Sequence, residues 1–232
     1  MIDWRFHHKE STVSTNQDAR AGSHGDVYTA DYQSAGRGRL DHKWISPSKT
    51  NLLMSVVLSV EGLAPEMVAT LPLVIGLAVV RAVGRDARLK WPNDVLVGGK
   101  KVAGILCERQ GDNVIVGIGV NVGQQTFPPE IAIGADFLGS VPREKVRDDV
   151  LESIAFLYEE WRASGFTSVH GEISAVDWLK GRELCVRQTD DDVNPVVGVS
   201  GGIRSDGSLD VGGVAVYAGE AHVMRVGRND ET

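Results

Sequence analysis

The sequence changes character at about Glu183, and this change is the strongest constraint on the fold. Before it, long apolar strand-like runs and helical patterns are mixed, whereas after it only short β-type runs occur, broken by Gly, Asp and Asn. We therefore place a boundary at Gly181 and expect a first domain over residues 1–181 and a small all-β domain over residues 182–232. This order predicts an α+β fold, in which a mixed sheet with helices packed on one side precedes a small β-barrel.

Hydrophobic periodicity locates the individual elements. The strands expected in the first domain cover residues 27–33, 51–60, 88–91, 94–97, 102–108 and 113–122. The helices expected there cover residues 65–84 with a kink at Pro72, residues 143–163, and residues 173–179. The apolar face of the helix over residues 143–163 is formed by Val146, Val150, Leu157 and Trp161. The short strands of the small domain cover residues 184–188, 196–203, 209–211 and 214–217.

Composition argues against several classes of protein. The 232 residues carry a net charge of −7, which argues against a general nucleic-acid binder. The N-terminus shows no signal-peptide pattern, and the most apolar run, residues 67–83, is interrupted by Pro72 and Gly76 and predicts a buried helix instead of a membrane span. Cys107 and Cys185 lie far apart in apolar runs and are expected to be free, buried thiols of a reducing compartment. We therefore expect a cytoplasmic protein.

Two polar segments near the N-terminus gather groups that suit polar or anionic ligands. The segment Ser14-Thr15-Asn16-Gln17 is typical of a helix start, which is a capping site and also collects several hydrogen-bond donors. In the loop from Gly36 to Trp44, glycines permit close approach, and Arg37 and Arg39 supply planar forks that suit phosphate or carboxylate. The loop lacks the GxxxxGK[ST] spacing of a P-loop, and Asp41 occupies the position of the third glycine of a dinucleotide loop. It is either a ligand-binding loop or a surface loop without a role.

Two further segments place polar groups on strands. The runs Lys90-Trp91-Pro92-Asn93-Asp94 (KWPND) and Gly98–Ile105 (GGKKVAGI) indicate a turn followed by a hairpin. Asp94 and Lys101 would then lie on neighbouring strands, where the carboxylate could help to hold Mg²⁺ and the lysine could meet the remaining negative charge. The run Gly117–Asn121 (GIGVN) indicates either a tight packing site or a backbone that another group approaches closely.

In this order and spacing, STNQ, GRGR with a following Trp, KWPND, GGKKVAGI and GIGVN closely resemble the biotin–protein ligase family. The resemblance runs from about Val13 to Asn121 and continues more weakly through residues 198–211, which are similar to the SH3-like barrel that ends those enzymes. It implies the class II synthetase-like catalytic fold of biotin and lipoate ligases for the first domain. Some family members carry an N-terminal helix-turn-helix, for which the residues before Ser14 leave no room, so specific DNA binding is not expected.

The resemblance also implies a reaction and its residues. Biotin would be activated with ATP and Mg²⁺ to biotinyl-5′-AMP and transferred to a lysine of a biotin carboxyl carrier protein or carboxylase subunit. Lys101, Arg37 and Arg39 match the catalytic cations, and Asp94 matches the carboxylate associated with Mg·ATP. The biotin-binding positions are matched by Ser14, Thr15, Asn16, Gln33, Gly36, Arg37, Lys101, Gly104, Gly117 and Gly119. The positions that bind ATP or the adenylate are matched by Arg39, Trp44, Asn93, Lys101 and Asn121.

The remaining expectations concern the loop, the assembly and the alternatives. The family loop usually continues GRGRxGRxW, whereas Asp41 and His42 replace the second Gly-Arg here with a negative charge and a titratable ring. The small domain is expected to close the ATP and acceptor side, and the protein is expected to be a monomer or a weak homodimer without a membrane partner.

Two other functions stay open. A lipoate or octanoate ligase is not expected to carry GRGR followed by KWPND, and a non-catalytic biotin-binding module has no use for phosphate-binding cations.

Overall fold

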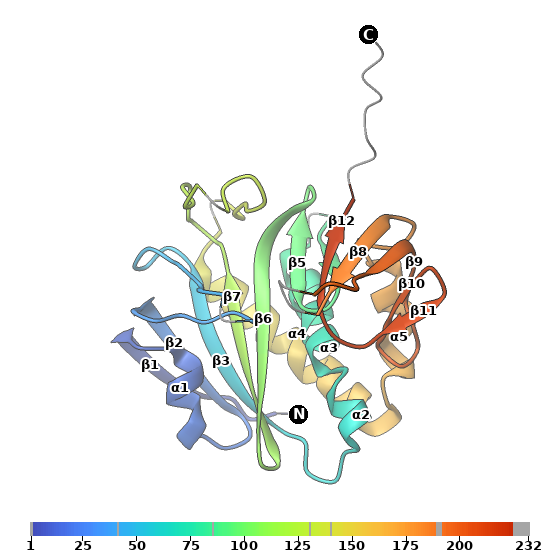
Figure 1. Ribbon diagram of the computed structural model, residues 1–232. Coiled ribbons are helices and arrows are strands. Elements are labelled where there is room, and N and C mark those ends of the chain that lie inside the picture. Colours follow the sequence, from blue (N-terminus) through green and yellow to red (C-terminus); the bar gives the residue numbers. More distant parts are fainter. Residues whose placement is uncertain are drawn as a thin grey trace.

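The computed structural model describes residues 2–40, 42–84, 86–129, 131–139, 141–188 and 192–224. Its main layer is a seven-stranded sheet with the strand order β1-β2-β3-β7-β6-β5-β4 (Figure 1). The β1–β2 pair is parallel and all other neighbours are antiparallel, so the sheet is mixed, as the sequence predicts. The strands are β1 (Arg5–Thr12), β2 (Asp26–Gln33), β3 (Leu52–Ser59), β4 (Arg88–Lys90), β5 (Asp94–Val97), β6 (Lys100–Gln110) and β7 (Asn113–Val120).

Long helices cover one face of this sheet and a short helical segment lies on the other (Figure 1). The helices are α1 (Thr15–Asp18), the 3-10 turn η1 (Ala19–Ala21), α2 (Pro65–Val68), α3 (Leu71–Val83), α4 (Arg143–Ser164) and α5 (Thr167–Ala175). Successive residues of β3 point to opposite faces of the sheet. Val56 joins the large core under α3 and α4, whereas Val57 packs with Ala19 of η1. The predicted α+β architecture is therefore confirmed, with α1 and η1 as a small addition on the second face.

A second sheet forms from the C-terminal part of the chain. It has the order β11-β10-β9-β8-β12 and is antiparallel throughout, which is consistent with the small barrel predicted from the sequence. Its strands are β8 (Glu183–Arg187), β9 (Val196–Ile203), β10 (Leu209–Val211), β11 (Val214–Val216) and β12 (Glu220–Val223). Several hydrogen bonds tie it to the first part of the chain, among them those from Trp91 Nε1 to Gly207 O (3.2 Å) and from Ile203 N to Asp177 Oδ2 (3.0 Å). The domain boundary at Gly181 remains an interpretation.

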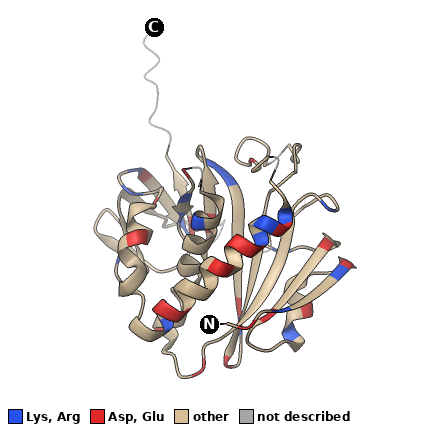
Figure 2. Cartoon of the chain, turned by 180° about the vertical axis from the view of Figure 1, so that it is seen from behind, with Lys and Arg blue, Asp and Glu red and all other residues tan. Residues whose placement is uncertain are grey.

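Helix α4 follows the sequence prediction, and the cysteines follow it in part. The four apolar residues that were expected to share one face of α4 are all buried. Figure 2 shows acidic and basic residues mixed along α4. Cys107 and Cys185 are both free thiols, although each is only partly buried.

Three sequence predictions about individual elements are wrong. The helix expected over residues 65–84 is two helices, and Pro72 lies in the first turn of α3, where a missing N–H costs nothing, instead of kinking a longer helix. The helix expected over residues 173–179 is α5, which begins six residues earlier, at Thr167, since Val169 and Ile173 form its buried face. Strands β1 and β12 were not predicted, because polar residues dominate β1 and β12 is only four residues long.

The segment Pro65–Val83 has the length and composition of a helix that could cross a membrane, with a mean hydropathy of 1.9. In this fold 61% of that segment is buried, and Ile75 and Val79 of α3 lie fully inside the core. The sequence prediction of a buried helix is therefore confirmed.

Asp26 anchors the exposed strand β1, which gives a first testable prediction. Its carboxylate accepts hydrogen bonds from Ser23 N (2.7 Å), Arg5 Nε (2.9 Å) and His7 Nε2 (3.3 Å). Burial opposes ionisation of Asp26, but these hydrogen bonds outweigh it and lower the pKa of the carboxyl group. We expect Asp26→Asn to lower the free energy of unfolding by about 1–2 kcal/mol near pH 7.

The sign of the pH dependence follows from the lowered pKa of Asp26 in the folded state. The stabilisation is complete above the ordinary carboxyl pKa of about 3.9 and is lost as the pH falls through the lower folded value. Urea unfolding of wild type and Asp26→Asn should therefore diverge at neutral pH and converge in acid. Asp3→Asn, which removes an exposed carboxylate of the same segment, is the control and should match wild type throughout. A difference that persists unchanged into acid would contradict this account of β1.

Candidate functional site

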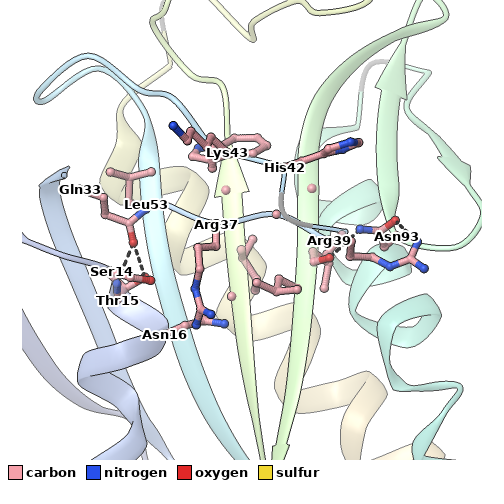
Figure 3. A pocket seen from close by; sticks show the side chains of 18 of the residues that line it. Ser14, Thr15, Asn16, Gln33, Arg37, Arg39, His42, Lys43, Leu53 and Asn93 are labelled. Carbon is pink, nitrogen blue, oxygen red and sulfur yellow. Dashed lines mark hydrogen bonds between the residues drawn. The ribbon is translucent and has the colours of Figure 1, made fainter. Parts of the chain in front are cut away.

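A pocket opens between the start of α1 and the middle of the main sheet (Figure 3). It brings together most of the residues that the sequence singled out, namely Ser14, Thr15, Asn16, Gln33, Arg37, Arg39, Trp44, Asn93, Asp94, Lys101, Gly104, Gly117 and Gly119. Two predicted residues do not line it. Gly36 begins the arginine loop, where its carbonyl accepts the Trp44 N–H (2.9 Å), and Asn121 lines an adjoining cavity.

One end of the pocket is a cluster of short polar groups around Thr15. Gln33 Oε1 accepts hydrogen bonds from both Thr15 N (2.7 Å) and Thr15 Oγ1 (3.0 Å), as the dashed lines in Figure 3 show. Ser55 Oγ lies 2.7 Å from Thr15 Oγ1 and 2.6 Å from Asn16 Oδ1. Ser14 occupies the N-cap position of α1, but its side chain makes no capping hydrogen bond, contrary to the simplest expectation from the sequence. These fixed donors and acceptors can recognise a small group that has both N–H and C=O.

The floor of the pocket is a stretch of sheet with glycines, against which the side chains of Trp44 and Asn16 lie. Gly104 of β6 and Gly119 of β7 lie directly opposite each other in the sheet. A Cβ atom on Gly119 would lie 2.5 Å from the Trp44 ring, and one on Gly117 would collide with Asn16 Oδ1. Glycine is therefore required at both positions of β7 by close approach. The Trp44 Nε1 donor is buried without a hydrogen-bond partner among the described residues, so it is available to a bound acceptor.

The arginine loop forms a tight turn, and the side chains of its two arginines point in different directions. Its backbone is closed by hydrogen bonds from Gly38 N to His42 O (2.7 Å) and from His42 N to Arg39 O (3.0 Å). Arg37 Nη2 lies 3.1 Å from Glu108 Oε1, and Arg39 Nη1 donates to Asn93 Oδ1 (3.3 Å) and more weakly to the carbonyl of Gly219 (3.4 Å). Of the two residues that replace the second Gly-Arg of the family loop, Asp41 lies outside the described part of the chain.

Asp94 and Lys101 lie on the paired strands β5 and β6, as the sequence predicts. Lys101 Nζ is 2.7 Å from Asp94 Oδ1 and 5.8 Å from the centre of the Trp44 ring. No group of three His, Cys, Asp or Glu side chains within the described ranges could hold a metal ion by itself. A single carboxylate beside a lysine fits Mg²⁺ only when substrate phosphates and water supply the other ligands, which is the usual arrangement for this ion.

A second cavity adjoins the first on the side of the loop after β7. Its own lining includes Ile45, Asn121, Phe127, Ile131, Gly134 and Ala135. Asn121 is held in place, since its Nδ2 donates to Asp136 O (3.1 Å). Four residues line both cavities, and these are His42, Lys43, Trp44 and Lys101. The two cavities therefore meet at a junction rich in positive charge.

Among the residues of the site that the sequence analysis missed are Ser55, Glu108 and Glu220. Ser55 carried a signal, because it is a polar residue inside the apolar run that became β3, and it is completely buried. Glu108 ends the apolar part of β6 and receives a hydrogen bond from Asn16 Nδ2 (2.6 Å) as well as the contact from Arg37. Glu220 belongs to β12 in the second sheet and lines the pocket, and nothing near it in the sequence indicated this position.

Comparison with known proteins identifies the family of the chain. The family model described as "Biotin/lipoate A/B protein ligase family" matches residues 8–124, which include every segment that lines the first cavity except β12. The chain belongs to this ligase family.

Individual members of the ligase family are similar over different shares of their length. The biotin–[acetyl-CoA-carboxylase] ligase of Mycobacterium tuberculosis is 32% identical over 234 residues, covering 92% of this chain and 87% of that protein. The bifunctional ligase/repressor BirA of Bacillus subtilis is 36% identical over 161 residues, covering 62% of this chain, and the matched part spans 49% of the BirA length. The structure of the Aquifex aeolicus biotin protein ligase in complex with biotin and ATP superposes with a TM-score of 0.83 at 30% identity, covering 95% of this chain and 98% of that one.

Proposed function

We propose that this chain is a biotin–protein ligase, which activates biotin with ATP and transfers it to a lysine of a carrier protein. The observation that carries the proposal is the junction of the two cavities at Lys101. One cavity ends in fixed small polar groups and the other offers an amide and apolar side chains. An enzyme that joins an acid to a nucleotide needs this arrangement, because the two reacting anions must meet beside positive charge.

The first cavity suits biotin. Its polar end can match the ureido ring, with Gln33, Thr15 and Ser14 as partners for the ring N–H and C=O groups. Beyond this end, Leu53 and Leu106 line the cavity and offer apolar contacts to the aliphatic chain. The biotin carboxylate would then reach the cations at the junction.

The first chemical step needs charge neutralisation and no covalent nucleophile. A carboxylate oxygen of biotin attacks the α-phosphorus of ATP, and pyrophosphate leaves with the electron pair of the broken P–O bond. Arg37, Arg39 and Lys101 would bring the two anions together, and charge-assisted hydrogen bonds of this kind are among the strongest in proteins. Asn93 and Asn121 would contact the nucleotide. When Mg²⁺ arrives with ATP, Asp94 would help to hold it, and the ion would screen the phosphate charge.

The names of the relatives support an acceptor class, because one of them is a ligase for acetyl-CoA carboxylase. We propose that the acceptor is the carrier domain of a biotin-dependent carboxylase, that the protein acts in the cytoplasm, and that it is a monomer or a weak homodimer. The direct test is incubation of the purified chain with biotin, Mg·ATP and an unmodified carrier domain. Mass spectrometry should show one biotinyl group on one lysine of the carrier, and the absence of any biotin-dependent mass change would contradict the proposal.

The polar end of the pocket argues against lipoate and octanoate as substrates. An aliphatic tail placed there would remove water from Thr15, Asn16 and Ser55 and would offer no hydrogen bond to the polar capacity that their contacts with one another leave unused. Each buried polar group left unsatisfied costs about 1–3 kcal/mol, so a strong preference for biotin is expected. A non-catalytic binding module would not need Arg39 in the first cavity or Lys101 where the two cavities meet.

Glu108 gives a prediction about biotin affinity. Its carboxylate accepts the Asn16 amide (2.6 Å) and lies 3.1 Å from Arg37, so it orients both groups at the pocket rim. A hydrogen bond to a charged group is worth about 1.5–3 kcal/mol, so we expect Glu108→Gln to weaken biotin binding about tenfold or more. Calorimetry measures this change directly. Glu152→Gln removes an exposed carboxylate on α4 and should bind biotin like wild type, whereas unchanged binding by Glu108→Gln would show that Glu108 does not orient the rim.

A further inference from the structure

We propose that His42 is the general base of the transfer step, which takes a proton from the ammonium group of the acceptor lysine. This inference rests on the proposed ligase function and assigns a role to a side chain that adenylation does not use. Two observations carry it. The His42 ring lines both cavities at their junction, and it lies beside a carboxylate that comes from the second sheet.

The position of His42 suits a group that meets a macromolecular substrate. Its side chain is 58% exposed, so a lysine on another protein can approach it from solvent. Figure 3 shows His42 and Lys43 at the upper rim of the pocket, above Asn16 and Arg37. The hydrogen bonds that close the turn at Arg39 hold the backbone of His42 in this position. The ring is therefore accessible to solvent, and the backbone that carries it is held in place.

The other charged groups around the junction are poor proton acceptors. Arg39 and Lys43 from the same loop and Lys101 from β6 are ordinarily protonated near neutral pH and then offer no free lone pair. The Asp94 carboxylate on β5 is paired with Lys101 at 2.7 Å. An imidazole ordinarily changes protonation between about pH 5 and 8, so it can accept a proton near neutral pH and release it to water afterwards. Of the described residues at the junction, His42 combines this property with access to solvent.

Glu220 of β12 is the positioning residue for this base. Its Oε1 lies 3.7 Å from His42 Nδ1, and its Oε2 lies 4.0 Å from His222 Nε2. A carboxylate on the Nδ1 side favours a proton on that nitrogen and stabilises the imidazolium, which leaves the Nε2 lone pair available for the lysine. The second sheet thus supplies a group that the catalytic sheet lacks at this point.

The proton balance of the step is complete without a further reactant. His42 Nε2 takes one proton from the lysine ammonium group and becomes imidazolium, which later returns the proton to water. The neutral amine attacks the carbonyl carbon of the biotinyl adenylate, a C–N bond forms, and the C–O bond to phosphate breaks with its electron pair leaving on AMP. The second proton of the nitrogen passes to solvent as the amide forms.

The test separates proton removal from every other part of the reaction. Enzyme loaded with biotinyl-5′-AMP is mixed either with the carrier domain or with hydroxylamine, which is already largely neutral at neutral pH and needs no base. We expect His42→Gln to slow transfer to the carrier lysine about 10²-fold or more, with hydroxylamine capture and adenylate formation close to wild type. Glu220→Gln should slow lysine transfer to a smaller extent and should also spare hydroxylamine.

His222→Gln is the matched control, because His222 is the other histidine near Glu220 but does not line either cavity. It should transfer biotin to lysine at the wild-type rate. The proposal is overturned if His42→Gln transfers to lysine at the wild-type rate, or if it slows lysine and hydroxylamine equally, since equal slowing indicates a structural role. Failure of the wild-type enzyme to form the adenylate would instead contradict the ligase function itself.

Discussion

Substituting Lys101→Ala should reduce adenylate formation far more than it reduces biotin binding. Lys101 Nζ lies at the junction of the two cavities, 2.7 Å from Asp94 and over the Trp44 ring. One lost hydrogen bond to the biotin carboxylate, worth about 1.5–3 kcal/mol, lowers the affinity about tenfold or somewhat more. Negative charge concentrates between carboxylate and phosphate in the transition state, so adenylation should fall by about 10²–10³-fold. Calorimetry of biotin binding and single-turnover adenylate formation measure the two effects separately.

Lys100→Ala is the control for Lys101. Lys100 is the neighbouring residue of β6, it is exposed, and it does not line either cavity. Loss of a solvent-facing lysine typically changes stability by under about 0.5 kcal/mol, so this variant should match wild type in both assays. If Lys101→Ala also matches wild type in both, Lys101 is not part of the site, and the role assigned to the β5–β6 hairpin is wrong.

Substituting Gly119→Ala should close the biotin pocket from below. The added methyl group would lie 2.5 Å from the Trp44 ring, which therefore has to move away from the sheet. Forcing an extra methyl into a well-packed site typically costs about 1–3 kcal/mol, so the free energy of unfolding should fall within that range. Biotin affinity should fall by about tenfold or more, because the ring and the methyl group compete for the space above the sheet.

Gly171→Ala provides the matched control for the glycine floor. Gly171 lies in α5, its φ is not in the left-handed region, and a Cβ there meets nothing within 4 Å. Alanine restricts the unfolded chain, so this variant should be as stable as wild type or about 0.4–1 kcal/mol more stable, with normal biotin affinity. Wild-type affinity and stability in Gly119→Ala would show that the floor is not closely approached.

The sequence predicted the catalytic sheet well where its strands are apolar and bounded by turn residues. The motif glycines and the Asp94–Lys101 pair could be placed because each lies on a strand or hairpin with strong local signals. The boundaries of α2 and α3 were not predictable from apolar content alone, since Pro72 fits both a kink and a helix start. Strand β1 escaped prediction because seven of its eight residues are exposed, so no alternation of apolar and polar residues marks it.

The parts of the site that the sequence did not show depend on contacts between distant segments. Arg39 reaches the carbonyl of Gly219 across 180 residues of sequence, and the neighbouring Glu220 lies beside His42. Strand β12 is short and half polar, so only the packing of the second sheet against the first reveals its role. Glu108 similarly became visible only when the register of β6 and β7 placed it beside Asn16 and Arg37. Local patterns identify elements, whereas such long-range partners need the fold.

The central claim is that the junction at Lys101 joins biotin to the nucleotide. Exchange of labelled pyrophosphate into ATP tests this most directly, because it reports reversal of the adenylation step and needs no carrier protein. We expect exchange that depends on biotin, is nearly abolished in Lys101→Ala, and is absent with lipoate or octanoate as the only acid. Exchange supported by lipoate or octanoate but not by biotin, or no exchange with any of the three acids, would contradict the account.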